Sequence, residues 1–261
     1  MSAELDQDTT EDAVLGGRLT LRQPRRGHRV GHDAILLAAA TAAQAGEHAV
    51  DLGAGVGGAG LALAVRVPGL RVTLVEIDAG LTALAAVNAE RNAMGDRVRA
   101  ITCDAEDVAA LGRAGLAAGS IDRVLMNPPF NDAGRQNVSP DPRRRLAHAA
   151  GPHLLMRWVA AAAYLLKPQG TLTLIWRADA LGDVLAALRP GFGAVAVLPV
   201  LPRAGVPAIR VLVRAAKGGT GAKNIAMRDY PGLILNDDNG KPSGAAESVL
   251  RAGAVLPMAE N

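Results

Sequence analysis

Apolar and polar residues follow two alternating patterns along the chain, and together these predict strands separated by helices. Short aliphatic runs predict strands, and apolar residues that recur every three or four positions predict helices. The predicted strands cover 48–53, 71–76, 98–102, 121–126, 170–176, 194–200 and 208–213; the predicted helices cover 34–43, 61–67, 79–93, 104–111, 152–166 and 178–188. The alternation indicates an α/β fold with a mostly parallel seven-stranded sheet, helices on both faces and a terminal antiparallel strand pair.

The two ends of the chain depart from this pattern. Residues 1–15 are acidic and polar, so we expect them to be disordered. Residues 16–216 form one domain with a short N-terminal arm. From 217 to 261 a hairpin-type turn at 237–240 and a short helix at 245–252 predict a C-terminal appendage packed on the same domain.

Composition narrows the class of protein. With 49% hydrophobic residues, the 261-residue chain can bury a core, and its acidic start is unlike a signal peptide. A single cysteine fits a reducing compartment, and no His/Cys cluster has metal-ligand spacing. We therefore expect a cytoplasmic monomer without a metal or a membrane span. The net charge is +3, and arginines cluster near the N-terminus and at 143–145.

One tetrapeptide has the strongest chemical signature. The sequence Asn127-Pro128-Pro129-Phe130 follows the predicted strand 121–126, and two prolines end a strand because neither donates a ladder hydrogen bond. The carboxyl edge of an open parallel sheet is where such folds bind ligands. The chain has only two Phe residues, so an aromatic at this loop favours a binding role over a buried turn.

A glycine loop lies between the first predicted strand and its helix. Within Asp51-Leu52-Gly53-Ala54-Gly55-Val56-Gly57-Gly58, the glycines also fit a dinucleotide pattern, which alone is weak evidence. Asp51 argues against it, because a fixed carboxylate near the helix N-terminus would repel a pyrophosphate. A ligand with ammonium or sulfonium character fits better.

Two further acidic residues end the next strands. Glu76 can accept hydrogen bonds from both ribose hydroxyls, and Asp104 is placed to accept one from an adenine amino group. Each alone has a simpler reading as a helix cap or a solvated acid. Their joint placement with Asp51 at three successive strand ends describes S-adenosylmethionine lying across the sheet edge.

These motifs resemble a known family. The run 51–57 resembles the D-x-G-x-G-x-G signature of class I S-adenosylmethionine-dependent methyltransferases, and 127–130 resembles their [DNS]-P-P-[YFW] signature, which marks methylation of exocyclic or amide nitrogens. The segments 23–29, 33–37 and 209–218 extend the resemblance, over roughly residues 16–255, to tRNA1(Val) adenine-N6 methyltransferases. The resemblance implies a Rossmann-like fold and a tRNA or other structured RNA as partner. After the tetrapeptide, 131–134 and the arginines that follow depart from better-known members.

The resemblance also assigns roles to residues. Asn127 and Pro128 would accept the hydrogens of the target amine, and Phe130 would stack on the base. The cofactor-binding residues would be Asp51, Gly53, Ala54, Gly55, Glu76, Ile77, Asp104, Ala105 and Asn127. Candidates for RNA contact are Arg25, Arg26, His28, Arg29, Arg143, Arg144 and Arg145, although a run of charges also fits a solvated loop.

Three alternatives remain. The same tetrapeptide occurs in rRNA guanine-amino and protein glutamine methyltransferases, and a non-catalytic RNA-binding module could retain the fold. Those enzymes usually carry an additional N-terminal domain, whereas the arm before the glycine loop is short. The intact Asn127 argues against the non-catalytic reading.

Cys103 has no histidine beside it in sequence, which favours a buried structural thiol over a nucleophile.

Overall fold

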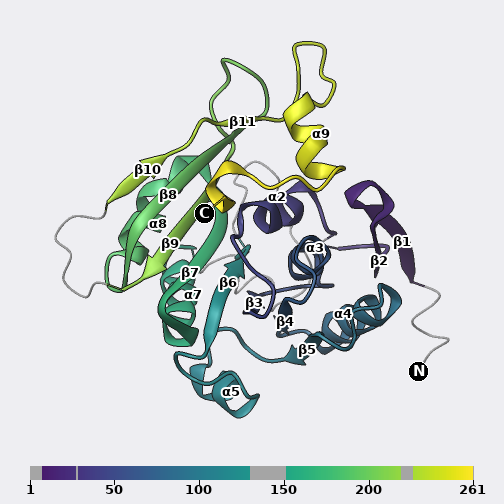
Figure 1. Ribbon diagram of the computed structural model, residues 1–261, viewed down its shortest axis with the longest axis vertical. Coiled ribbons are helices and arrows are strands. Elements are labelled where there is room, and N and C mark those ends of the chain that lie inside the picture. Colours follow the sequence, from purple (N-terminus) through teal and green to yellow (C-terminus); the bar gives the residue numbers. More distant parts are fainter. Residues whose placement is uncertain (1–7, 28, 130–150, 219–225, 261) are drawn as a thin grey trace.

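A mixed sheet lies at the centre of the protein, with strand order β10–β8–β9–β7–β6–β3–β4–β5 and the short β11 paired to β8 (Figure 1). The computed structural model describes residues 8–27, 29–129, 151–218 and 226–260. The strands of this sheet are β3 (His48–Leu52), β4 (Arg71–Glu76), β5 (Val98–Thr102), β6 (Ile121–Met126), β7 (Leu166–Arg177), β8 (Phe192–Leu201), β9 (Arg210–Lys217), β10 (Met227–Asp229) and β11 (Leu233–Ile234).

Strand directions match the prediction from sequence. β3 to β7 are mutually parallel, whereas β9 is antiparallel to both β7 and β8. All seven predicted strands are present. β10 and β11 were not predicted, because each is too short to show a pattern; both extend the sheet by parallel pairing to β8. β3, β4 and β6 therefore end side by side at one edge.

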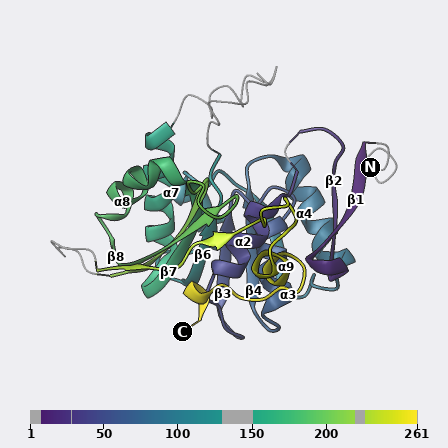
Figure 2. The same ribbon diagram turned by 90° about the horizontal axis from the view of Figure 1, so that it is seen from above.

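Helices cover both faces of the sheet. On one face α2 (His32–Ala40), α3 (Gly58–Arg66) and α4 (Ala79–Arg91) enclose an aliphatic core. On the other, α5 (Val108–Arg113), α7 (Gly151–Leu165) and α8 (Leu181–Leu188) enclose a second core that contains both Trp residues. Viewed from above, α7 and α8 lie across the strand layer from α9 (Gly244–Leu250) (Figure 2). No helix among the described residues is long and apolar enough to cross a bilayer.

The N-terminal arm is a hairpin. β1 (Thr9–Val14) pairs with β2 (Leu19–Pro24) through a 3₁₀ turn, η1 (Leu15–Gly17). The expectation of disorder over 1–15 is therefore wrong for 9–14. The hairpin is ordered by docking: the buried Asn88 side chain accepts from the Arg22 amide at 2.7 Å and donates to its carbonyl at 3.0 Å.

The C-terminal segment returns to the same side of the molecule as the hairpin (Figure 1). α9 packs on α2, and the Leu256 amide donates to the Ala39 carbonyl at 2.9 Å. A short 3₁₀ turn, η3 (Pro257–Ala259), buries Met258 in the same core. These contacts attach the C-terminal segment to α2 and to the aliphatic core.

Candidate functional site

The glycine loop joins the end of β3 to the start of α3. Gly53 has φ +72°, and an added Cβ would lie 2.4 Å from the indole of Trp158, so only glycine fits. Asp51 lies near the end of β3, and its Oδ2 accepts the Gly60 amide of the first turn of α3 at 2.8 Å. The carboxylate thus occupies the helix N-terminus where a pyrophosphate would otherwise bind.

Asp51 is fully enclosed. Burial raises its pKa to about 7; the bond from Gly60 opposes this rise, and the nearby Glu76 carboxylate adds to it. A positively charged ligand beside this carboxyl group would stabilise its ionised form and lower the pKa again. The pocket around Asp51 therefore favours a cation and disfavours an anion.

Glu76 holds the loop against the next strand. Its Oε2 accepts the Gly55 amide at 2.8 Å and its Oε1 accepts the Asp78 amide at 3.0 Å. The side chain is only 9% exposed, yet it reaches the ligand-facing glycine loop from the end of β4. The neighbouring Ile77 is 64% exposed, which places an apolar side chain at the open edge.

The third strand end carries Asp104 and Ala105. Asp104 is exposed, and its Oδ1 accepts the Glu106 amide at 2.9 Å. Ala105 is buried. Burial, together with Asp107 and Asp104, raises the pKa of the adjacent Cys103 thiol, which argues for the structural reading of that residue.

Asn127 follows β6 at the centre of this edge. Its Oδ1 is buried, and no described residue donates a hydrogen bond to it. Burying a hydrogen-bond acceptor without a partner costs free energy, so this oxygen is suited to accept a hydrogen bond from a ligand. Pro128 is buried and Pro129 exposed. Phe130 lies outside the described residues.

These strand ends surround a cleft of about 290 Å³. Asp51, Gly53, Ala54, Gly55 and Asn127, which are among the expected cofactor-binding residues, line it. Glu76 joins it through Gly55, whereas Ile77, Asp104 and Ala105 lie further along the strand edge, outside the lining. The predicted set is therefore brought to one edge, although the cleft itself covers only part of it.

Sequence reasoning missed one wall of the cleft. The end of the segment between β2 and α2, together with the first turn of α2, closes it, with Val30, Gly31, His32, Asp33 and Ala34 in the lining. Gly31 is the N-cap of α2, and Asp33 pairs with Arg210 of β9 at 3.0 Å. The resemblance at 23–29 and 33–37 includes part of this wall but gives no indication that it closes the cleft.

The RNA candidates separate into three groups. Arg25 and Arg26 are exposed beside the cleft. Arg29 lines the cleft, but its guanidinium is ion-paired to Asp12. The remaining ones fall outside the described residues: His28, Arg143, Arg144 and Arg145. Within the described part of the chain, no group of three His, Cys, Asp or Glu side chains could hold a metal ion.

A family model described as the methyltransferase small domain matches residues 28–199, well over half of the chain. The chain belongs to this family. The membership confirms the methyltransferase class predicted from the glycine loop and the Asn-Pro-Pro-Phe sequence, and with it the predicted cofactor, S-adenosylmethionine. The residues present fit this group: the buried Asp51 carboxyl group suits a cationic ligand, and the Glu76 carboxylate at the end of the next strand would accept hydrogen bonds from ribose hydroxyls.

Three relatives of this chain are methyltransferases by name, two acting on tRNA and one on a release factor. A tRNA1(Val) (adenine(37)-N6)-methyltransferase of Porphyromonas gingivalis is 33% identical over 60% of this chain, which spans 61% of that relative's length. One of Dickeya chrysanthemi is 28% identical over 92% of this chain and 94% of its own. A release factor glutamine methyltransferase of Chlorobaculum tepidum is 30% identical over 57% of this chain and 52% of its own.

Solved structures agree on the fold. A predicted O-methyltransferase of Agrobacterium tumefaciens superposes with a TM-score of 0.70 at 26% identity, covering 86% of this chain and 98% of its own. TrmN of Thermus thermophilus, at 22% identity and a TM-score of 0.52, covers 71% of this chain and 48% of its own. The Rossmann-like class I methyltransferase fold expected from the sequence is confirmed.

Proposed function

We propose that this methyltransferase transfers a methyl group from S-adenosylmethionine to the exocyclic amino nitrogen of a nucleobase, adenine in tRNA. The observation that carries the proposal is the buried, unpartnered Oδ1 of Asn127 at the wall of the cofactor cleft. An amino group has two hydrogens that need acceptors. The Asn127 oxygen accepts one, and the Pro128 carbonyl, next in the chain, accepts the other.

The bound cofactor supplies an electrophilic methyl group on a sulfonium. The protein's own part is to bind, orient and exclude water. An exocyclic amine is a weak nucleophile because its lone pair is delocalised into the ring. Two acceptors at Asn127 and Pro128 hold the amine with its lone pair directed at the methyl group and favour a tetrahedral nitrogen. Preorganised polar contacts of this kind account for much of the rate enhancement in enzymes.

An RNA substrate is supported by two features. Arg25 and Arg26 are exposed on the loop that leads into the wall of the cleft, and arginines there suit phosphate contacts. Two relatives bear the name of a tRNA adenine-N6 methyltransferase. An enzyme acting on tRNA would work in the cytoplasm, so that location is part of the proposal.

The side-chain amide of protein glutamine is the second candidate acceptor. An amide nitrogen also has two hydrogens and a delocalised lone pair, and one relative is named a release factor glutamine methyltransferase. The cleft geometry at Asn127 suits either methyl acceptor, the nucleobase amine or the glutamine amide. The exposed arginines Arg25 and Arg26 favour RNA, because RNA is a polyanion.

The decisive experiment incubates purified protein and labelled S-adenosylmethionine with unmodified tRNA and, separately, with release factor. Mass spectrometry of digested tRNA should reveal N6-methyladenosine, and the Asn127→Ala variant should leave it undetected under the same conditions. Label in release factor but not in tRNA would show that the methyl acceptor is a protein glutamine and not a nucleobase. Label in neither, with cofactor bound, would refute both acceptors.

A further inference from the structure

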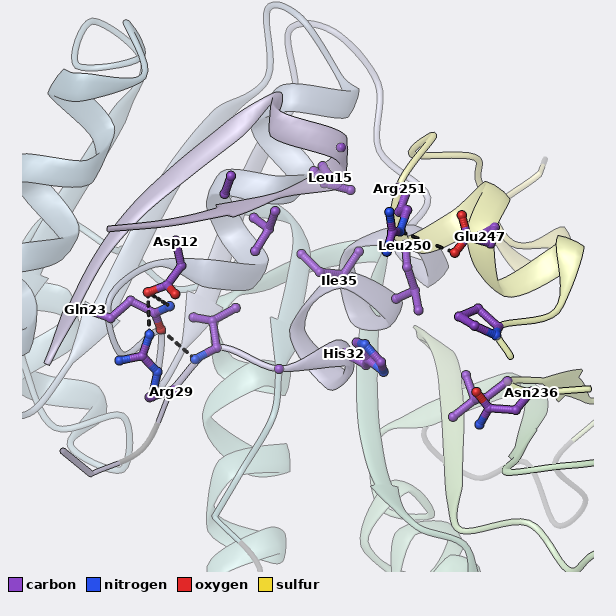
Figure 3. Close-up of a pocket in the computed structure, with 17 residues that line it drawn as sticks. Asp12, Leu15, Gln23, Arg29, His32, Ile35, Asn236, Glu247, Leu250 and Arg251 are labelled. Atoms are coloured by element: carbon purple, nitrogen blue, oxygen red, sulfur yellow. Dashed lines mark hydrogen bonds and ion pairs between the residues drawn. The ribbon is translucent and has the colours of Figure 1, made fainter. Parts of the chain in front are cut away.

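A groove of about 590 Å³ lies beside the cofactor cleft, between the two ends of the chain. One wall is the β1–β2 hairpin and the other is the C-terminal segment around α9. Figure 3 shows Asp12 and Arg29 at one end, Asn236 at the other, and Ile35 and Leu250 between them. The volume falls within the roughly 300–1,000 Å³ typical of small-ligand pockets.

The two walls of the groove contact each other directly, and this contact fixes their relative position. The Arg18 Nη2 donates to the Arg251 carbonyl at 3.2 Å, across 233 residues of sequence. Gly16 has φ +63°, and a Cβ there would lie 2.8 Å from the same carbonyl oxygen, so the hairpin and the end of α9 meet closely. The groove is therefore a built feature of the fold and not a gap between loose ends.

Charges along the groove are compensated. Asp12 is ion-paired to Arg29 and accepts from Gln23 Nε2 at 3.1 Å, and Glu247 is paired to Arg251 at 3.3 Å. With these pairs formed, the lining offers little attraction to a phosphate. It suits a neutral, planar group with polar edges.

A nucleobase has these properties. The half-buried Leu250, which packs against the core that contains Ile35, offers an apolar surface for the face of a ring. The planar guanidinium groups of Arg29 and Arg251 are of the kind on which unstacked RNA bases lie. The Asn236 side chain lies at the far end; its Nδ2 donates to the Pro202 carbonyl at 3.2 Å, and its Oδ1 can accept a hydrogen bond from a base edge.

The groove adjoins the proposed reaction site. Residues 29–32 line both cavities, so one short segment separates them. Arg25 and Arg26 precede this segment, are exposed, and form no ion pair with any described residue. They are free to contact phosphates of a chain that crosses the wall. Sequence-specific RNA recognition commonly uses bases extruded from loops in this way.

We propose that the groove binds a second nucleobase of the substrate RNA, extruded from the same loop as the target base and a neighbour of it. This inference rests on the proposed RNA substrate. The first base is methylated in the cleft at Asn127, and the second is read between the hairpin and α9. Selection among RNAs then depends on a nucleotide that is never modified.

The test fills the groove. Leu250→Trp places an indole where the base would lie, and Val255→Trp adds the same indole to an exposed position of the same segment outside the lining. For Leu250→Trp, kcat/KM for tRNA should fall roughly 5- to 150-fold, the range for one lost base contact. S-adenosylmethionine affinity by calorimetry should stay within two-fold of wild type, on the order of the calorimetric error for a site left intact.

A second measurement does not depend on the variant's folding. Wild-type protein is crosslinked under ultraviolet light to tRNA containing 4-thiouridine, and the adducts are mapped by mass spectrometry. Adducts on peptides spanning 236–251 support the groove. Adducts confined to other peptides, or equal tRNA kinetics for wild type and Leu250→Trp, overturn it while the methyltransferase remains an RNA enzyme. A wild-type protein that methylates no tRNA overturns the proposed function instead, and the second base with it.

Discussion

The cofactor cleft and the terminal groove adjoin each other but are built in opposite ways. The cleft is formed at the ends of β3 and β6, from residues at or just beyond the strand ends, such as Asp51 within β3 and Asn127 after β6. The groove is assembled from a hairpin and a helix at opposite ends of the chain. Buried, partly uncompensated polar groups characterise the cleft, whereas ion pairs compensate the charges of the groove. The local sequence thus carries the chemistry of the cleft, whereas the shape of the groove depends on contacts between segments that are far apart in the chain.

The largest effect on turnover should come from replacing Asn127, whose buried Oδ1 accepts no hydrogen bond from any described residue. Asn127→Ala removes the oxygen that orients the amine, so turnover should fall at least ~100-fold, the usual cost of losing one preorganised polar contact. S-adenosylmethionine affinity should change only a few-fold. Single-turnover methylation and calorimetry measure the two effects, with Asn239→Ala in an exposed turn as control. Near-normal turnover would show that another group orients the amine.

Glu76 should affect binding more than turnover. Its carboxylate accepts the Gly55 amide at 2.8 Å, and in the proposed complex it would also accept the ribose hydroxyls. Glu76→Ala should weaken S-adenosylmethionine binding by ~1.5–3 kcal/mol, the scale of hydrogen bonds to a charged group. Calorimetry of this variant against Glu90→Ala, on the exposed side of α4, provides the measurement. Unchanged affinity would remove Glu76 from the site.

Asp51 should make cofactor binding depend on pH. Its folded pKa, about 7, lies above the unfolded value of 3.8. The free protein therefore holds a proton that the unfolded chain has lost, and its stability should fall as pH rises from about 4 to about 7. Cofactor binding requires the carboxylate and should tighten as pH rises from 6 to 8.

The matching control is Asp51→Asn, which cannot titrate. Urea unfolding and calorimetry across this pH range should give flatter profiles for the variant than for wild type, and the difference isolates Asp51 from the titration of the cofactor itself. Identical profiles would mean that Asp51 stays ionised in the folded protein despite its burial.

The smallest effect should lie on the arm. Replacing Arg25 and Arg26 together with Ala should weaken tRNA binding several-fold at low salt and reduce the slope of log K against log salt by up to ~1.8, near 0.9 for each phosphate contact. Arg113→Ala with Arg189→Ala, two exposed arginines on the far helical layer, is the matched control. Parallel salt slopes for all three proteins would place the RNA surface elsewhere.

Much of the cleft could be predicted because its residues have local signatures. A glycine loop after a strand, an acid at the end of the next strand and Asn127 before two prolines can each be recognised within a few positions. The geometry of parallel sheets then places them together, since parallel strands end at a common edge. The alternation of strands and helices determined the fold class in the same way.

Tertiary structure alone decided the surroundings of that cleft. The hairpin is ordered because Asn88, 66 residues from Arg22, satisfies its backbone. Asp33 pairs with Arg210 across 177 residues, and Arg18 reaches the Arg251 carbonyl across 233. Such contacts leave no periodic or local trace in the sequence, because their free energy arises only once the sheet has brought the chain ends together. The sequence by itself therefore determined the cofactor edge and its chemistry, and packing between distant segments decided the wall of the cleft and the groove beside it.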